Sequence, residues 1–206
     1  AHDPSPASST SAPARPIDFD RLATLCTSGP LSSLEKFFSV VSAPPPAGSG
    51  MSTFAIANET SPTTGLAPVH YAARSGALEI LKWLVEQAGA LVEMEDREGE
   101  TALHKACLAG KLPIVTYLLR QGADPDAQDA DGWTPLHNSC SQGYLDLVKV
   151  LIEQGKAEVN KAAGRGGWTP LMNAASKGHL PIVRYLTQKQ GADPFARNKD
   201  GETAFD

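Results

Sequence analysis

Apolar residues along this chain recur in short groups with helical spacing, separated by glycines and polar stretches. A typical group is Ile114, Val115, Leu118 and Leu119, which occupy positions i, i+1, i+4 and i+5 and so form one face of a helix. Pro113 stands in the first turn of that helix, where its missing N–H would have no helical partner anyway. The pattern therefore predicts a series of short helices.

The same order of elements returns every 33 to 35 residues. The sequence GWTPLH at 132–137 is followed by GWTPLM at 167–172 and preceded by GETALH at 99–104 and GLAPVH at 65–70. Internal repetition at such a period determines the whole architecture of a protein.

Each repeat predicts the same local structure. A short helix opens after a Thr cap candidate, as at Thr134-Pro135, and a glycine ends it. A second helix follows and closes with Gly-Ala-Asp, as at 122–124 and 191–193. A polar crossing with Asp-Gly, a hairpin-type turn signal, then leads to the next repeat.

Composition and spacing divide the chain into segments. Residues 1–16 hold Pro, Ser, Ala and Thr with almost no apolar bulk, so we expect a disordered tail. Two apolar stripes between residues 17 and 38 have helical spacing and predict a degenerate capping repeat. The predicted repeat domain, 17–206, comprises this capping repeat at 17–63, full repeats at 64–96, 97–129, 130–163 and 164–198, and a truncated repeat at 199–206.

The capping repeat contains more residues than the period requires. Residues 39–63 read as a loop insertion, because Pro44-Pro45-Pro46 and the following glycines and serine are typical of loops. Such a loop is either mobile padding or a partner contact, and the sequence leaves both interpretations open.

Composition narrows the class of protein. The formal net charge of −5 argues against direct nucleic-acid binding, which needs a basic face. No apolar run approaches the roughly 18 residues of a membrane span, so we expect no membrane insertion. Cys26, Cys107 and Cys140 are odd in number and far apart, which is typical of reduced, buried thiols and favours the cytoplasm or nucleus.

The chain starts at Ala1 and stops at Asp206 within a repeat, so we expect a fragment of a longer protein, monomeric as a fragment.

His70, His104 and His137 recur in the same position of successive repeats and raise the question of a metal site. Packed helices lie about 10 Å apart, too far for shared coordination through metal–nitrogen bonds of about 2 Å. We therefore expect each imidazole to join adjacent loops through hydrogen bonds.

Other candidate chemistry is weak. Cys107 and Cys140 lack the His and acid partners of a catalytic thiol, and the carboxylates form no evident pair. The glycine-rich residues 164–167 lack the strand, spacing and lysine of a phosphate-binding loop. The sequence predicts no enzyme, no catalytic residue, no cofactor and no metal.

The repeated motifs resemble those of the ankyrin repeat family. The resemblance rests on GWTPLH at 132–137, Gly-Ala-Asp at 122–124 and 191–193, and GHLPIV at 178–183. It is strong from 65 to 206 and weak from 17 to 64. It implies an all-α solenoid of about five to six stacked helix pairs with β-hairpin fingers, the first repeat degenerate and the last truncated. It also implies binding of a protein or peptide by the finger tips and the concave face of the first helices.

The finger residue before each Thr points away from the core in this family. Trp133 and Trp168 hold this position in neighbouring repeats and would form an exposed aromatic pair. Indoles are enriched in interface hot spots, although packing on a finger is an equally open interpretation.

Residues that vary between repeats, while the core positions stay the same, complete the candidate surface. Most lie on the first helix where the family implies an outward direction, and we expect Tyr144 to extend that surface. The predicted partner-binding residues are Trp133, Trp168, Tyr144, Leu108, Lys105, Asn138, Asn173, Tyr71, Arg74, Glu98, Glu100 and Asp131.

Charge varies along the predicted fingers, which are acidic over residues 93–131 and basic over 156–165. One interpretation is charge that keeps loops solvated. The other is that the acidic fingers steer a partner with a basic segment. Two further functions stay open: the substrate-targeting domain of a larger enzyme, and a dedicated chaperone for a basic client protein.

Overall fold

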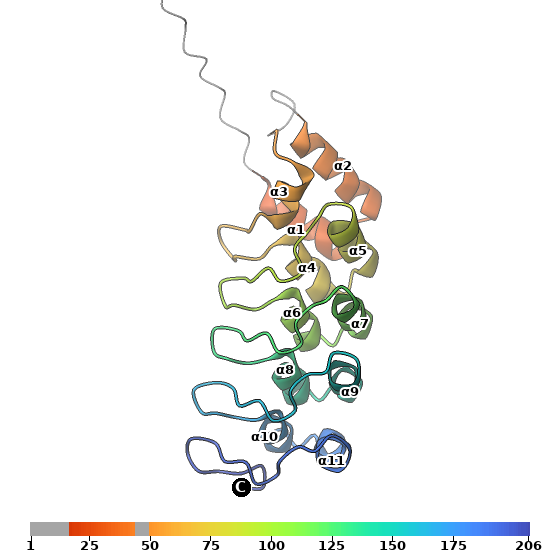
Figure 1. The fold of residues 1–206 in the computed structure, drawn as a ribbon. Coiled ribbons are helices and arrows are strands. Elements are labelled where there is room, and N and C mark those ends of the chain that lie inside the picture. Colours follow the sequence, from red (N-terminus) through yellow and green to blue (C-terminus); the bar gives the residue numbers. More distant parts are fainter. Residues whose placement is uncertain (1–16, 44–49) are drawn as a thin grey trace, which may run out of the picture.

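The computed structural model describes residues 17–43 and 50–206, and the tail expected at 1–16 lies outside this part of the chain (Figure 1). The described residues form eleven helices and no named strand. They are α1 (Phe19–Ser28), α2 (Leu31–Ser42), α3 (Thr53–Asn58), α4 (Pro68–Ser75), α5 (Leu78–Glu86), α6 (Ala102–Leu108), α7 (Leu112–Arg120), α8 (Pro135–Gln142), α9 (Leu145–Glu153), α10 (Pro170–Ser176) and α11 (Leu180–Lys189). None of these helices has the length and apolar character needed to cross a membrane.

The helices stack in two columns, which confirms the predicted all-α solenoid. The inner helices α1, α4, α6, α8 and α10 pack one on the next, and the outer helices α2, α5, α7, α9 and α11 form a second column behind them. The loops between repeats extend sideways from the inner column as a row of fingers (Figure 1). Each repeat therefore buries its apolar surface mainly against its neighbours.

The core is built from the periodic apolar positions of the sequence. Ile114 and Leu118 of α7 are fully buried, as are Leu151 of α9 and Leu186 of α11. Burial of one such side chain stabilises a fold by about 1.5–3 kcal/mol. The three cysteines are also buried, and burial raises the pKa of the Cys107 thiol to about 12, so it packs as a small apolar group.

The fingers are hairpin-shaped turns with little β-structure. In the second finger Asp96 N donates to Glu100 O, and in the third Asp129 N donates to Trp133 O. The expected β-hairpins are reduced to one antiparallel bridge in the described residues, between Ala163 and Trp168 of the fourth finger. The fourth finger has one more residue in its turn, which allows both bridge hydrogen bonds at 2.8 Å.

The interpretation of residues 39–63 as a loop needs correction. Helix α2 continues to Ser42, and α3 places Ile56 and Ala57 in the core. The segment then closes the first finger, where Ser61 N donates to Leu66 O. Only residues 44–49, which include the three prolines, lie outside the described residues. The rest is part of the packed structure.

Candidate protein-interaction surface

Three histidines hold the fingers in place. In the second full repeat, His104 Nδ1 accepts hydrogen bonds from the N–H and hydroxyl of Thr101, at 3.2 and 3.0 Å. Its Nε2–H then donates to Trp133 O of the next finger at 3.1 Å. His70 bonds in the same way to Met94 O, and His137 to Trp168 O. Each imidazole thus connects two repeats, as the sequence predicted.

These bonds require neutral imidazoles, because Nδ1 must accept. Burial is the main reason that the pKa of His70 and of His104 lies below the ordinary value. Burial lowers the pKa of His137 from 6.5 to about 4. Within the described residues no group of three or more His, Cys, Asp or Glu is placed to hold a metal ion.

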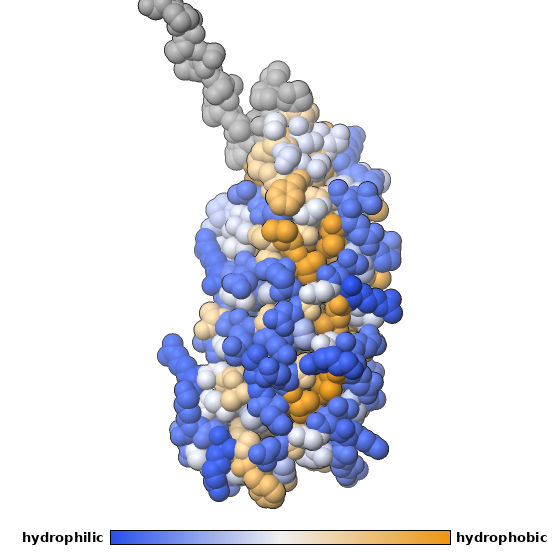
Figure 2. Space-filling view, in the orientation of Figure 1, coloured by the Kyte–Doolittle hydropathy of each residue, from blue (hydrophilic) through white to orange (hydrophobic). Residues whose placement is uncertain are grey.

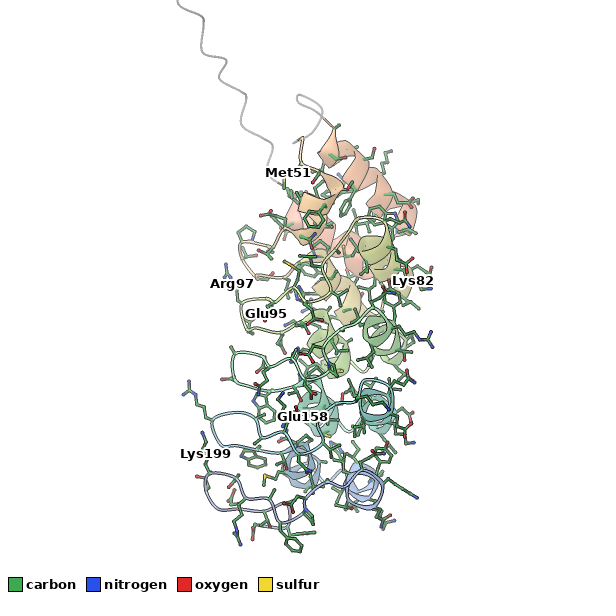
Figure 3. The ribbon with its side chains drawn as sticks, viewed as in Figure 1. Met51, Lys82, Glu95, Arg97, Glu158 and Lys199 are labelled. Atoms are coloured by element: carbon green, nitrogen blue, oxygen red, sulfur yellow. The ribbon has the colours of Figure 1, made fainter. Side chains whose placement is uncertain are left out.

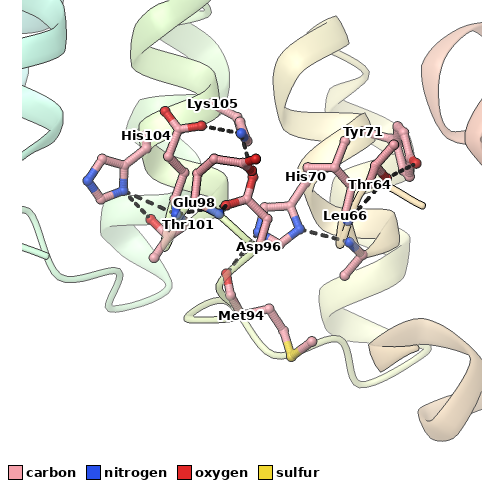
Figure 4. A network of polar contacts seen from close by, with 12 residues as sticks. Thr64, Leu66, His70, Tyr71, Met94, Asp96, Glu98, Thr101, His104 and Lys105 are labelled. Carbon is pink, nitrogen blue, oxygen red and sulfur yellow. Dashed lines mark hydrogen bonds and ion pairs between the residues drawn. The ribbon is translucent and has the colours of Figure 1, made fainter. Parts of the chain in front are cut away.

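The residue after each of these histidines points toward the finger of its own repeat. Tyr71 Oη lies 3.0 Å from Thr64 Oγ1 of the first finger. Lys105 Nζ contacts Glu100 Oε2 and lies 2.5 Å from Asp96 Oδ2 in the second finger (Figure 4). This position, which we call the finger-facing slot, is held after the three histidines by Tyr71, Lys105 and Asn138. In the fourth repeat Asn173 holds it after Met172, which replaces the histidine.

The prediction that the finger-facing slot is open to solvent is wrong. Tyr71, Asn138 and Asn173 are only 8%, 8% and 4% exposed, because the finger covers the start of the helix. Lys105 is also largely covered and is held by its two carboxylates. Burial would raise the pKa of Asp96, but Lys105 and the Glu100 N–H bring it below the usual value.

Trp133 and Trp168 are half-buried and do not form the expected pair. The Trp133 ring meets His137 edge-on at 5.5 Å and lies over Gly164 of the next finger. Trp168 packs over Gly166 of its own finger. No ring contact joins the two indoles in the described part of the chain. Each indole therefore combines a packing role with a partly exposed surface.

The remaining predicted residues lie apart from one another. Leu108 is half-buried on α6, and Arg74 is exposed, with its guanidinium 6.0 Å from the centre of the Tyr71 ring. Tyr144 lies between α8 and α9, where its ring packs over Gly110. That turn is at the opposite end of α8 from the finger, so Tyr144 lies away from the finger tips.

Several acidic finger residues have structural roles. Asp96 Oδ1 accepts the N–H groups of Glu98 and Glu100, and Asp129 Oδ1 accepts those of Asp131 and Trp133. Glu100 is paired with Lys105. The exposed carboxylates of the acidic fingers include Glu95, Glu98, Asp124 and Asp131. Figure 3 shows Glu95 beside Arg97, whose guanidinium donates to the first finger at Thr63 O.

Sequence reasoning missed a second set of contacts between repeats. Asn58, Glu93, Asp126 and Asn160 each accept a backbone N–H about one repeat later, from Leu91, Asp124, Glu158 and Asp193 respectively. We call these four residues the inter-repeat ladder. They differ in type, so only their common spacing of about one period could have identified them.

The exposed apolar groups were also missed. On the face shown in Figure 2, a broken apolar band runs along the stack between polar fingers and polar outer helices. Phe195 and Phe205 are 75% and 70% exposed and lie 6.4 Å apart, centre to centre. A hollow of about 420 Å³ lies beside them, lined in part by Trp168, Met172 and Glu202.

The fold and this finger-bearing surface define an ankyrin-type interaction protein. A family model of ankyrin repeats in three copies matches residues 48–129 and 110–198, more than half of the chain. The chain therefore belongs to the ankyrin repeat family.

Among known proteins, the chain is 60% identical over 190 residues to the FYVE zinc finger domain protein UPA1 of Mycosarcoma maydis, a match that covers 92% of this chain and 14% of that protein. It is 47% identical over 64 residues to protein phosphatase 1 regulatory subunit 27 of Homo sapiens, covering 31% of this chain and 41% of the relative. A match to alpha-latroinsectotoxin-Lt1a of Latrodectus tredecimguttatus has 40% identity over 60 residues, which is 29% of this chain and 4% of the toxin. The chain thus spans less than half the length of each of these relatives.

Proposed function

We propose that this chain is a non-catalytic module that binds a protein or peptide through its fingers and the concave face of its inner helices. The observation that carries the proposal is the contrast between constant and variable positions. Thr, His and Leu recur because they hold the repeats together. The exposed residue on the finger varies, from Glu98 to Asp131 to Arg165 in successive fingers. One relative is named as a regulatory subunit of protein phosphatase 1, which fits a role in binding.

The exposed acids of the second and third fingers favour a partner with a basic segment. Glu98 and Asp131 are exposed at two neighbouring finger tips, so they add to the same local potential. Ala130 N donates to Glu98 O at 2.8 Å, which fixes the spacing of the two tips. Charge at such a rim raises the association rate more than the final affinity.

The experiment begins with affinity purification of the full-length protein and identification of its partners by mass spectrometry. The association rate of the purified partner is then measured at increasing salt concentration. We expect the association rate of the wild-type chain to fall as the salt concentration rises. At low salt, the Glu98→Lys, Asp131→Lys variant should associate about tenfold more slowly than the wild type.

A matched control places lysine at Glu79 and Asp146 on the outer helices, whose side chains are 73% and 77% exposed. The control should change the rate far less than the finger variant. A rate that is independent of salt, or equal effects of both variants, would contradict steering by the fingers.

We propose further that the module acts as a docking unit within a longer chain. The matched stretch is only 14% of the length of the UPA1 relative, which supports a docking role within a longer chain. Deleting the repeats from the full-length protein should remove its partner while other activities of that protein remain measurable. Retention of the partner after the deletion would refute the docking role.

A further inference from the structure

The finger-facing slot changes character halfway along the solenoid. Tyr71 and Lys105 have partners in their own fingers, as described above. The side chains of Asn138 and Asn173 make no hydrogen bond within the described residues, and Nδ2 of each is covered. Both side chains are more than nine-tenths buried. Two equivalent amides in adjacent repeats are therefore buried without a partner.

The fingers explain why the two amides are unpaired. The position that holds Glu100 in the second finger, where it pairs with Lys105, holds Trp133 in the third finger and Trp168 in the fourth. An indole has no acceptor to offer an amide. Asp129 accepts its two backbone N–H groups through Oδ1, as Asp96 does, but no hydrogen bond joins its Oδ2 to Asn138 in the described residues. In the fourth finger Ala163 replaces this acid.

An unpaired buried amide is costly to the fold. Leaving such a donor unsatisfied costs about 1–3 kcal/mol, and an apolar side chain would avoid that cost. Neither Oδ1 nor Nδ2 of these carboxamides is hydrogen-bonded in the described part of the chain. A half-turn about Cβ–Cγ can therefore exchange the positions of the nitrogen and the oxygen. Nδ2 of each amide is covered in the present orientation, so an outside acceptor would meet the N–H groups only after this half-turn.

The exposed charges near the two asparagines change sign along the row of fingers. Glu98 and Asp131 are exposed on the second and third fingers. Arg165 is exposed on the fourth finger, and Lys177, the residue directly after α10, is also exposed. Residues 93–131 contain nine Asp and Glu against four Lys and Arg, whereas 161–206 contain four against seven. The charge thus changes from mainly acidic to mainly basic along the solenoid.

We propose that Asn138 and Asn173 donate hydrogen bonds to main-chain carbonyl oxygens of an extended segment of a protein partner. The segment places a basic residue near Glu98 and Asp131 and an acidic residue near Arg165 and Lys177. This inference rests on the interaction function proposed above and specifies the occupant of that surface. Repeats about 10 Å apart and a rise of about 3.1 Å per residue in polyproline II put the two carbonyls about three residues apart, which is one turn, so both face the same side.

The first test separates a binding role from a structural one. Replacing both asparagines by leucine removes unpaired donors, so the melting temperature should stay equal or rise. The Asn138→Ala, Asn173→Ala pair repeats the measurement without adding volume. The control Tyr71→Phe removes a donor that has a partner in Thr64 and should lower the melting temperature. Lower stability in both asparagine pairs would show that the scaffold holds the amides and would overturn the proposal.

The second test measures binding by the whole 206-residue chain, with phage-displayed random dodecapeptides as the probe. Selected peptides should share a basic and an acidic residue about three to six positions apart. Their affinity for the Asn138→Leu, Asn173→Leu variant should fall at least about tenfold, a loss typical of a truncated hot spot. Selection without this charge pattern, unchanged affinity, or no selection at all counts against the proposal.

The two proposals fail in different ways. A natural partner that binds the fingers but does not distinguish the asparagine variants from the wild type overturns the assignment of the slot and leaves the interaction function intact. A partner that binds only the outer helices overturns both.

Discussion

At the scale of single residues, the histidines couple the fold to pH. His70, His104 and His137 are held neutral, with pKa values below that of an exposed histidine. The unfolded chain therefore binds protons before the folded one as pH falls. Their contribution to stability is complete above pH 6.5 and is lost as pH falls toward the His137 pKa of about 4.

The fourth repeat supplies a variant that tests this coupling. Met172 stands where His137 does in the third repeat, and its Sδ accepts the Thr169 N–H at 3.4 Å without titrating. We predict that His137→Met gives a shallower decline of the unfolding free energy between pH 6.5 and about 4, measured by urea denaturation. An unchanged slope would mean that His137 is not a source of the pH dependence.

Lys156 has a backbone conformation that favours glycine. Its φ is 65°, and the residues at the same point of other repeats are Gly89, Gly122 and Gly191. A side chain in this left-handed region costs about 1–2 kcal/mol. We predict that Lys156→Gly raises the unfolding free energy by about 1 kcal/mol, whereas the control Lys156→Ala does not. Equal effects of the two variants would show that the lysine side chain, and not its backbone, determines the difference.

The sequence identified which residues vary but not how they are covered. Asn138 and Asn173 differ from the residues at the same position of other repeats, yet nothing in their type shows that they are buried. The finger that precedes α8 is closed by backbone bonds such as Asp129 N to Trp133 O, which carry no signal in residue type. The histidine contacts were predictable because the same residue recurs in the same place.

At the scale of elements, the inter-repeat ladder joins each loop to the next. Asn58 and Asn160 are better suited to it than the two acids, because each also donates to a carbonyl, Gly89 O or Gly191 O. Burial is the main reason that the pKa of Glu93 and of Asp126 is raised. A carboxyl group whose pKa is raised in the folded state makes the fold less stable as pH rises through that pKa. Ionised Glu93 and Asp126 therefore lower the free energy of unfolding near neutral pH.

The ladder yields a stability prediction. Asp126→Asn should raise the unfolding free energy at neutral pH by up to about 1 kcal/mol, the typical net value of one hydrogen bond. Thermal or urea denaturation measures the change, with Asp146→Asn, an exposed substitution outside the ladder, as the control. A decrease for Asp126→Asn would mean that the charge of Asp126 stabilises the loop.

Helix α3 shows the limit of prediction at this scale. It has six residues, too few for an apolar period, and Ser52 caps it by accepting the Ala55 N–H. Only contact with α2 and α4 makes Ile56 a core residue. The repeated helix pairs were predictable, because their period recurs along the chain.

At the scale of the whole molecule, the solenoid places charges of opposite sign in a row. Its acidic and basic stretches follow the order of the sequence, because each repeat packs on the preceding one. The sequence therefore predicted the direction of the charge gradient. The stack adds two unpaired amides, Asn138 between the acidic and basic parts and Asn173 within the basic part, which no linear pattern displays.

The central claim is that a partner occupies the fingers and the inner helices, and photo-crosslinking in the full-length protein tests it most directly. A benzoylphenylalanine is placed at Asp131, on a finger, or at Ser176, at the end of the inner helix α10, and at Glu79 or Asp146, on the outer helices. The account predicts that the same partner protein is crosslinked from Asp131 and Ser176 and not from Glu79 and Asp146. Crosslinks to the partner mainly from the outer helices would contradict it.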